Sequence, residues 1–257
     1  MISPQAFIDP SAKIGNDVTI YPFAYIEGDV VIGDHCTIYP YVSIMSGTRM
    51  GDNNTVFQGT VLGALPQDFE YKGDKTTLVI GSGNTIRENV VINRATFPDG
   101  ETTIGDNNFI MEGVHVSHDA KIGNYCVVGY GTKIAGNCEI HDGAILSSNV
   151  IANPGTRVGS CAMVQSGCRF SNDVPPYIVA HETPIAYGGV NSTVLTNAGI
   201  DEKIQNHIAQ AYRLVFNGKV SLFDAINQVV EQVPGGEEID KIIGFLRSTK
   251  IGLITKV

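Results

Sequence analysis

Aliphatic residues recur at every sixth position through the first sixty residues of this chain. The ladder reads Ile8, Ile14, Ile20, Ile26, Ile32, Ile38, Ile44, Met50, Val56 and Leu62. It resumes in phase at Ile80, and it continues from Ile104 to Phe170 with Ala152 as a weak rung. Ten consecutive hits are far more than a 43% hydrophobic composition gives by chance. A fixed period this short predicts a parallel β-solenoid of hexapeptides whose rungs point inward.

Glycine adds a longer period of 18 residues. It directly follows the rung at Gly15, Gly33, Gly51, Gly105, Gly123 and Gly159. Because 18 residues are three hexads, one coil has three flat sides and a triangular cross-section. We interpret these glycines as corner residues that tolerate a positive φ. Asn and Asp are frequent beside them, and both tolerate the left-handed region.

Small or β-branched side chains occupy the position two residues before each rung, which predicts a narrow interior corner. Four of the five cysteines have this position: Cys36, Cys126, Cys138 and Cys168. We therefore expect buried free thiols and neither disulfides nor metal ligands. Cys161 lies outside this register and has no predicted place.

The net charge of −9 and the absence of a basic run argue against a nucleic-acid partner. No apolar run is long enough to span a bilayer, and the first residues do not resemble a signal peptide. These features predict a cytoplasmic location.

Two interruptions divide the hexads. We predict a solenoid domain over residues 1–190 with an inserted loop over 63–79, and a smaller break follows over 93–103. A loop this long on a regular scaffold is usually functional or mobile. Asp173-Val174-Pro175-Pro176 ends the coils, because two prolines supply no ladder donors.

A helical period replaces the hexads after residues 177–200, which we interpret as a connector. One apolar face is Ile204, Ile208, Ala211, Tyr212, Val215 and Phe216. A second helix starts at the N-cap Ser221, and a third carries Ile239 and Leu246. We predict a C-terminal α-helical bundle over 191–257 that covers the open end of the solenoid.

His115 and His118 flank the rung Val116 and lie outside the inward register. Both side chains should point away from the core, so packing does not account for them. An outward imidazole followed by Asp119 suits a general base. The spacing alone fits two exposed polar residues equally well. The other histidines stand alone and read as structural or surface residues: His35, His141, His181 and His207.

Seven further landmarks follow one another along the chain. They are Gln67–Tyr71, Ile86–Glu88 with Arg94 and Thr96, His115–Asp119, Ala135-Gly136, Asp173–Tyr177, Gly189–Asn191 and Ala211–Arg213. With the hexads and the helical tail, they resemble the acyl carrier protein-dependent UDP-N-acetylglucosamine O-acyltransferases of lipid A biosynthesis. Hexads alone are shared by many acyltransferases, whereas the loop, the paired histidines and the tail together are specific.

The resemblance implies an O-acyltransferase that forms a homotrimer of left-handed parallel β-helices, with active clefts between adjacent subunits. It implies transfer of an (R)-3-hydroxyacyl group from acyl carrier protein to the glucosamine 3-hydroxyl of UDP-N-acetylglucosamine. This is the first step of lipid A biosynthesis, and it implies no cofactor and no metal.

The resemblance also implies roles for individual residues. His118 would be the general base, the Gly136 N–H would hold the oxyanion, and Asp119 would adjoin the base. The residues implied to contact the substrates are Gln67, Asp68, Phe69 and His115 for the sugar region, Asn191 for the nucleotide, and Ser148, Met163 and Ser166 for the acyl groove. A docking patch for the acidic carrier protein would use Arg157, Arg169, Lys203 and Arg213.

Several positions differ from the commoner family pattern. Asn replaces His at Asn93, Asn137 and Asn153, and Asn197 and Glu70 replace an arginine and a lysine. The catalytic pair is retained, so the reaction type is unaffected, whereas the nucleotide contacts should differ. Arg157 and Arg169 are candidates to supply the missing positive charge.

Four alternatives compete with this hypothesis. A γ-type carbonic anhydrase needs three His ligands, and only His115 and His118 lie together. The N-acyltransferase of the same pathway is expected to carry an extra N-terminal uridine-binding domain. An acetyl-CoA-dependent sugar acetyltransferase leaves the loop and tail unexplained, and a non-catalytic scaffold would show no turnover at all.

Overall fold

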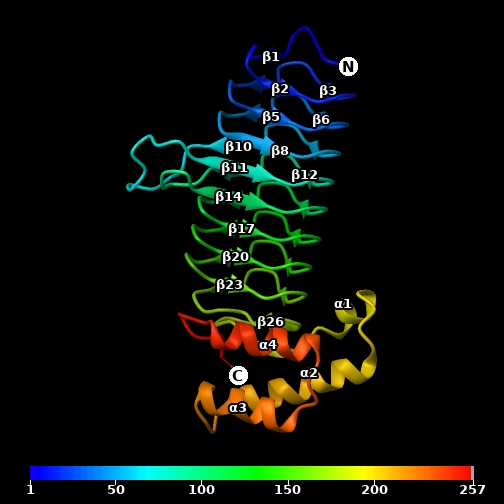
Figure 1. The fold of residues 1–257 in the computed structure, drawn as a ribbon, viewed down its shortest axis with the longest axis vertical. Coiled ribbons are helices and arrows are strands. Elements are labelled where there is room, and N and C mark those ends of the chain that lie inside the picture. The colour runs from blue at the N-terminus through cyan, green and yellow to red at the C-terminus, as the bar shows by residue number, and fades with distance from the viewer. Residues whose placement is uncertain (256–257) are drawn as a thin grey trace.

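The computed structural model describes residues 1–255 and shows a tall three-sided prism with helices at one end (Figure 1). Each wall is one sheet whose neighbouring strands come from successive coils. Wall A contains β3 (Thr19–Ile20), β6 (Thr37–Ile38), β9 (Thr55–Val56), β12 (Thr85–Ile86), β15 (Phe109–Ile110), β18 (Val127–Val128), β21 (Ile145–Leu146), β24 (Met163–Val164), β26 (Ile178–His181) and β27 (Ala186–Val190).

Walls B and C complete the triangle. Wall B contains β1 (Phe7–Ile8), β4 (Tyr25–Ile26), β7 (Ser43–Ile44), β10 (Val61–Ala64), β13 (Val91–Asn93), β16 (His115–Val116), β19 (Lys133–Ile134), β22 (Ile151–Ala152) and β25 (Arg169–Phe170). Wall C contains β2 (Lys13–Ile14), β5 (Val31–Ile32), β8 (Thr48–Met50), β11 (Thr77–Ile80), β14 (Glu101–Ile104), β17 (Lys121–Ile122), β20 (Glu139–Ile140) and β23 (Arg157–Val158).

The predicted rungs form the core. From Ile20 to Phe170 each rung is at most 3% exposed, and rungs of adjacent coils stack in register, as Ile92, Val116 and Ile134 do. Burying one such side chain contributes about 1.5–3 kcal/mol. A continuous apolar column therefore supports strands of only two to five residues.

The glycines after the rungs lie where predicted, but the reason given for them was wrong. Positive φ occurs two residues later, for example at Asp17 (53°) and His35 (58°). Gly15 itself is outside the left-handed region, and a Cβ there would lie 2.6 Å from the carbonyl carbon of Gly33. Glycine is required because successive coils approach too closely for a side chain.

The cysteine prediction is confirmed for the interior register. The buried thiols are Cys36, Cys126, Cys138 and Cys168. Burial raises the pKa of Cys126 to about 12, so this thiol is protonated at neutral pH. Cys161 lies at a corner, where its φ is 55°.

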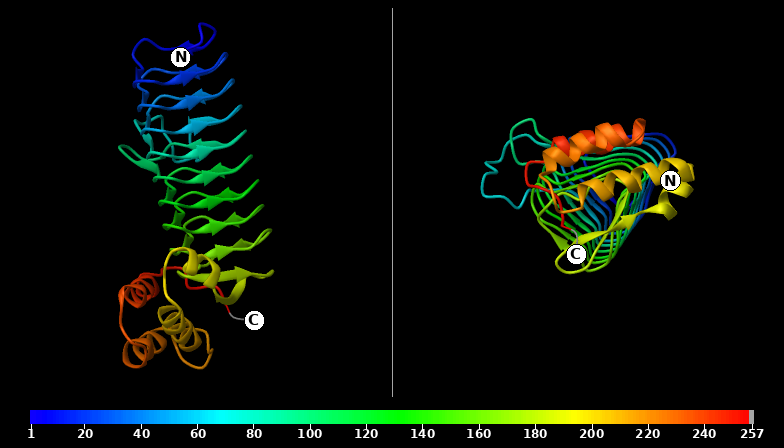
Figure 2. Two further views of the ribbon diagram at one scale, coloured as in Figure 1. Left: turned by 90° about the vertical axis from the view of Figure 1, so that its right-hand side faces the viewer. Right: turned by 90° about the horizontal axis from the view of Figure 1, so that it is seen from below.

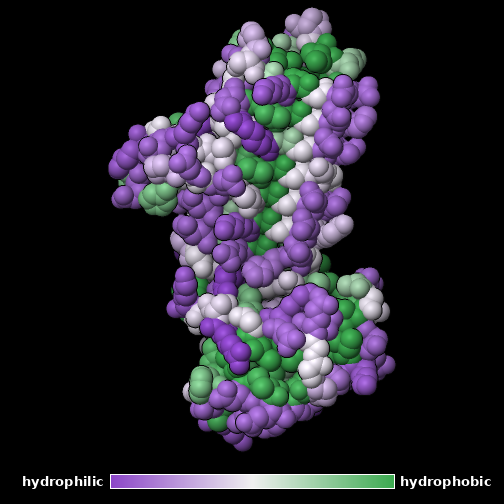
Figure 3. Space-filling view, in the orientation of Figure 1, coloured by the Kyte–Doolittle hydropathy of each residue, from purple (hydrophilic) through white to green (hydrophobic). Residues whose placement is uncertain are grey.

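The inserted loop projects from the corner between walls B and C (Figure 1). It covers residues 65–76 and is shorter than the predicted 63–79, because β10 and β11 extend into it and pair with the next coil. The smaller break, between β13 and β14, leaves the same corner. Most of the inserted loop is polar at its surface, whereas apolar side chains follow the middle of wall C (Figure 3).

Residues 177–200 are more ordered than a connector. β26 adds a parallel strand to β24, and β27 returns antiparallel to it. A short helix, α1 (Ser192–Asn197), follows. The sequence did not reveal this hairpin because it has no hexad period.

Three helices lie at the C-terminal end of the prism, as predicted: α2 (Glu202–Val215), α3 (Leu222–Gln232) and α4 (Glu237–Arg247). Helix α2 crosses the open end, and α3 and α4 are displaced to one side (Figure 2). The predicted cap is present, since the Ser221 hydroxyl accepts from Asp224 N. Within residues 1–255, no helix has the length and apolarity needed to cross a bilayer. The boundary near residue 190 stays a prediction, and residues 256–257 lie outside the described residues.

Two buried contacts fasten the helices to the last coil. The Tyr212 hydroxyl donates to the carbonyl of Pro176 over 2.6 Å. The Arg157 guanidinium pairs with Asp173, with Nη2 2.6 Å from Oδ2, and lies 4.3 Å above the ring of Phe245 on α4. Asp173 is 1% exposed. Arg157 is therefore a structural residue at this junction.

Replacing Arg157 with alanine should weaken this junction. The buried Asp173 carboxylate would lose its counter-charge, a change that typically costs about 3–5 kcal/mol. We expect a lower unfolding temperature and faster amide hydrogen exchange in α4. Arg169→Ala is the control, since Arg169 is exposed and should leave both measurements unchanged. Equal exchange in the two variants would contradict the structural role of Arg157.

Candidate active site

His118 lies at the corner where the chain turns from wall B to wall C. The rung Val116 is buried inside the prism, and the backbone turns at Asp119, whose φ is 59°. The imidazole lies outside the apolar column, as predicted. Its side chain is nevertheless only 13% exposed.

Two carboxylates flank the His118 ring. Nδ1 is 2.8 Å from Asp119 Oδ2, and Nε2 is 3.4 Å from Asp68 Oδ2. Asp119 is the next residue in the chain, whereas Asp68 comes from the inserted loop. When Nδ1–H donates to Asp119, Nε2 is left unprotonated and can accept a proton.

Gly136 lies one coil beyond His118 at the same corner. A Cβ at Gly136 would be 2.5 Å from His118 Cε1 and 2.7 Å from Nε2. Asn137 N donates to the carbonyl of His118 over 3.1 Å and lies in the left-handed region, with a φ of 60°. The backbone of one coil thus lies directly against the Cε1–Nε2 edge of the imidazole.

The Asp119 carboxylate is itself held in place. Thr96 N donates to Oδ1 and Oδ2 over 3.3 and 3.2 Å, and Asp119 N donates to the Thr102 hydroxyl over 2.8 Å. Sequence reasoning named Thr96 only as a landmark of the resemblance and gave neither residue a contact with Asp119. Thr102 has the small interior position two residues before a rung, so it was expected only to pack.

The loop residues separate into two groups. Asp68 is half-buried and reaches His118. Gln67 is exposed, and Phe69 is 98% exposed at the surface of the loop. Of these three loop residues, only Asp68 reaches His118 within a single chain.

His115 lies on β16, outside the core and half-buried. Its burial lowers the pKa of the imidazole, and the charges of Lys133 and His118 lower it further. His115 should therefore be neutral at pH 7 and act as a hydrogen-bonding group.

The remaining predicted contacts lie on another part of the prism. Met163 is on β24 in wall A, and Ser148 and Ser166 follow β21 and β24 at the corner of walls A and B. Asn191 is 4% exposed, and its Nδ2 donates to the carbonyl of Cys161 over 3.0 Å. A single chain does not bring these residues to His118.

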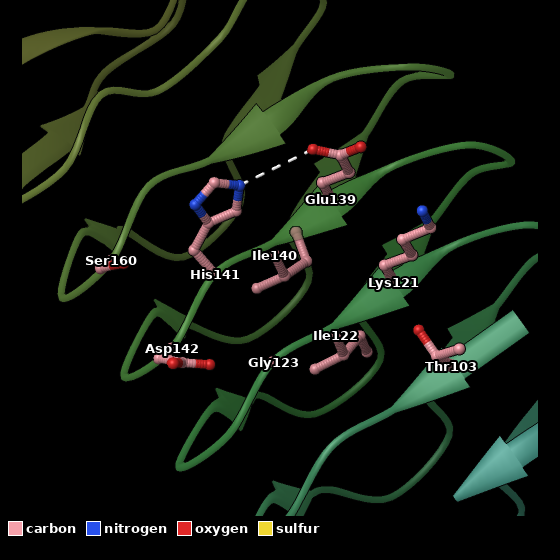
Figure 4. Close-up of a pocket in the computed structure, with 9 residues that line it drawn as sticks. All are labelled: Thr103, Lys121, Ile122, Gly123, Glu139, Ile140, His141, Asp142 and Ser160. Atoms are coloured by element: carbon pink, nitrogen blue, oxygen red, sulfur yellow. Dashed lines mark ion pairs between the residues drawn. The ribbon is translucent and has the colours of Figure 1, made fainter. Parts of the chain in front are cut away.

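A groove of about 480 Å³ lies elsewhere, on wall C (Figure 4). His141 and Glu139 line it, with Nε2 3.7 Å from Oε2. The His141 ring also meets Phe245 of α4 edge-on at 5.7 Å. The predicted catalytic residues do not line this groove. Among residues 1–255, no three His, Cys, Asp or Glu side chains are grouped to hold a metal ion.

A triangular stack of hexapeptide coils with a histidine–carboxylate pair at one corner defines the class of hexapeptide-repeat transferases. The profile of bacterial transferase hexapeptides matches residues 11–45 and 101–136. The profile described as UDP N-acetylglucosamine O-acyltransferase, domain 2, matches residues 173–254.

Full-length relatives identify the family. Proteins named Acyl-[acyl-carrier-protein]--UDP-N-acetylglucosamine O-acyltransferase are 42% identical over 239 residues in Ectopseudomonas mendocina and 39% identical over 254 residues in Pseudomonas aeruginosa. These alignments cover 93% and 98% of both chains. The chain belongs to this family and is an O-acyltransferase.

Solved structures agree. The UDP-N-acetylglucosamine acyltransferase of Bacteroides fragilis is 49% identical, with a TM-score of 0.97 over 99% of this chain and 100% of that one. An Arabidopsis enzyme of the same description is 26% identical, with a TM-score of 0.86 over the whole of both chains. The predicted fold, a left-handed parallel β-helix with C-terminal helices, is confirmed.

Proposed function

We propose that the protein transfers an (R)-3-hydroxyacyl group from acyl carrier protein to the glucosamine 3-hydroxyl of UDP-N-acetylglucosamine, as the first step of lipid A biosynthesis in the cytoplasm. The names of the relatives supply the two substrates. The observation that carries the chemistry is the His118 ring, which is paired with Asp119 through Nδ1 and has its other nitrogen directed toward Asp68 and Gly136.

In the proposed mechanism, His118 Nε2 takes the proton of the 3-hydroxyl as that oxygen attacks the thioester carbonyl. The new C–O bond gives a tetrahedral oxyanion, which the Gly136 N–H stabilises. The C–S bond then breaks, and the proton passes from His118 to the departing sulfur. A positioned base contributes roughly 10²–10⁴ in rate, and one oxyanion donor contributes about 3–4 kcal/mol.

Asp119 would hold the imidazole in the required tautomer and stabilise the imidazolium that forms. Asp68, Gln67 and His115 would orient the sugar, because they surround the base or extend from the loop above it. Asn191 would contact the nucleotide. These roles stay predictions.

We infer a homotrimer from the distribution of these residues. His118 is at the corner of walls B and C, whereas the predicted acyl contacts Ser148, Met163 and Ser166 belong to wall A and its other corner. A neighbouring subunit would supply the missing half of the cleft. Exposed aromatic residues on the N-terminal coils suit such a contact, because they leave an apolar surface to cover: Phe7 (54%), Phe23 (50%), Tyr25 (41%) and Tyr41 (63%).

A product assay tests the reaction. Purified protein supplied with (R)-3-hydroxyacyl carrier protein and UDP-N-acetylglucosamine should give the 3-O-acylated sugar nucleotide, detected by mass spectrometry. Acetyl-CoA should not replace the acyl donor. Equal turnover with acetyl-CoA would instead support a small-sugar acetyltransferase.

Carrier-protein docking should depend on charge. Of the predicted basic residues, Arg157 is held by Asp173, which leaves Arg169, Lys203 and Arg213 on the surface. We expect the apparent KM for acyl carrier protein to rise with ionic strength, since salt screens exposed charges. The Lys203→Glu/Arg213→Glu variant should show a raised KM at low salt and a weaker salt dependence. A KM that stays constant with salt would contradict steering by these residues.

A further inference from the structure

The two carboxylates beside His118 come from different elements, but one short segment contacts both elements. This segment is the brace, residues 93–96, at the end of β13. It forms the start of the smaller break in the coils and lies at the same corner as His118. Its contacts connect the inserted loop on one side with Asp119 on the other.

The first half of the brace holds the inserted loop. Asn93 Nδ2 donates to the carbonyl of Leu65 over 2.6 Å, and Arg94 N donates to the carbonyl of Ala64 over 3.0 Å. The Arg94 guanidinium links the loop to the preceding coil, because Ser46 lies between β7 and β8 and Tyr71 lies in the loop. Nη1 donates to the carbonyl of Ser46 over 2.6 Å, and Nη2 donates to the Tyr71 hydroxyl over 2.9 Å.

Tyr71 connects Arg94 to the rest of the loop, including Asp68. Its ring centre is 5.9 Å from the Arg94 guanidinium carbon, and its hydroxyl donates to the carbonyl of Asp74 over 3.2 Å. Asp68, three residues before Tyr71, accepts from Tyr71 N through its backbone carbonyl over 3.2 Å. The residue that reaches His118 Nε2 is therefore two hydrogen bonds away from Arg94.

The last residue of the brace holds the other carboxylate, because Thr96 N donates to Asp119. The brace therefore fixes the groups at both nitrogens of the His118 ring. The Arg94 side chain donates to Ser46 and Tyr71, and neither is His118 or a predicted substrate-binding residue. Its connection to His118 therefore runs through the loop.

Burying the brace lowers the stability of the fold, because it leaves several polar atoms without partners in the described part of the chain. Among residues 1–255, the buried polar atoms without a protein partner are Thr76 Oγ1, Asn93 Oδ1, Arg94 Nε, Thr96 Oγ1 and Asn108 Nδ2. Four of these five belong to the brace or to the adjoining end of the loop. Each unpaired buried group costs about 1–3 kcal/mol. An arrangement that lowers stability locally suits a segment kept for the geometry of a site.

We propose that Arg94 is a positioning residue of the acyl transfer: through Tyr71 it holds the inserted loop so that Asp68 stays at His118. This inference rests on the proposed function. Because Asp68 is proposed to orient the sugar, loosening the loop should weaken use of UDP-N-acetylglucosamine more than use of the acyl donor.

The test compares Arg94→Ala, Arg94→Lys and Tyr71→Phe in the full-length protein. Arg94→Ala should lower kcat/KM for UDP-N-acetylglucosamine by roughly 10–100-fold, by analogy with the outer-shell groups that orient metal-binding side chains. The change should lie mainly in the KM for the sugar nucleotide. Arg94→Lys should recover part of the loss. A lysine ammonium can bond to Ser46 or to Tyr71, whereas the planar guanidinium bonds to both at once. Tyr71→Phe should resemble Arg94→Lys.

Limited digestion with trypsin supplies a readout independent of turnover. Lys72 and Lys75 are exposed on the inserted loop, so Arg94→Ala should be cut there faster than the parent protein. Arg49→Ala is the matched control, since the Arg49 guanidinium bonds to Asp29 and to the carbonyl of Thr48. This control should change neither the loop cleavage nor the KM.

Three outcomes would overturn the role of Arg94. They are parent-like kinetics in Arg94→Ala, an equal loss in Arg49→Ala, or a loss explained by a large drop in the unfolding temperature. Failure of the proposed function itself would be seen separately, as turnover that survives in His118→Ala.

Discussion

Replacing His118 with alanine should lower kcat by roughly 10²–10⁴-fold, the contribution of a positioned general base. The loss should appear with both substrates saturating, because the imidazole acts in the transition state and not in initial binding. The unfolding temperature and the oligomeric size should hardly change. His118 lies outside the column of rungs, so its removal opens no cavity in the core.

His207→Ala is a suitable control for this experiment. His207 lies on α2, away from the corner of walls B and C, and its substitution should leave kcat unchanged. Turnover by His118→Ala at the parent rate would remove the general base and with it the proposed mechanism. A kcat loss accompanied by dissociation of the oligomer would point to a structural role.

Replacing Gly136 with alanine should have the second-largest effect, a fall in kcat of roughly 10²-fold or more if the base is displaced. The added methyl would lie 2.5 Å from His118 Cε1, so the ring has to move. The Gly136 N–H remains in this variant. The loss therefore measures displacement of the imidazole and leaves the proposed oxyanion donor in place. Stability should change little, because Gly136 is not in the left-handed region.

A double variant separates the two contributions. If Gly136→Ala acts by moving His118, adding it to His118→Ala should produce no further loss, since the effects of groups that act as a unit are not additive. A further fall in kcat would mean that the methyl also disturbs the substrate or the oxyanion donor. Gly244→Ala is the control, because a Cβ at Gly244 on α4 meets no atom within 4 Å.

The solenoid and the outward His118 with its neighbour Asp119 could be predicted from the sequence because both depend on local or periodic information. A period of six gave the rungs, and a period of 18 gave the stacking of coils. The same period places Gly136 beside His118, since 118 and 136 differ by 18. The pairing of Asp119 with His118 could be predicted without knowing the fold, because the two residues are adjacent in the chain.

The features that were missed depend on contacts between irregular segments. Asp68 reaches His118 from a loop that has no hexad register, and Arg94 holds that loop from another irregular segment. Arg157 looked like a free cation, but the chain turns after the last coil and brings Asp173 beneath it. In each case the partner is set by where a loop or a chain end folds back, which the period does not encode.

The structure explains three of the positions at which asparagine replaces the histidine of the commoner family pattern. Asn93 contributes to the brace by bonding Leu65, and Asn137 occupies a left-handed corner that asparagine tolerates. Asn153 donates to the Ser171 hydroxyl over 2.6 Å and accepts from Arg169 over 3.3 Å. These amides serve the scaffold at the corner that carries His118.

Because each coil takes 18 residues, the height of the prism changes only in steps of one coil. Neighbouring parallel strands are about 4.8 Å apart, so the three coil steps from β16 to β25 separate the coil of His118 from the helical end by about 14 Å. Removing a whole coil between them would shorten that spacing by one step and keep every rung inward. A deletion of any length that is not a multiple of six would turn the following rungs toward solvent. Insertions and deletions in this segment are therefore constrained to whole hexads, and to whole coils wherever the same wall must carry the same function.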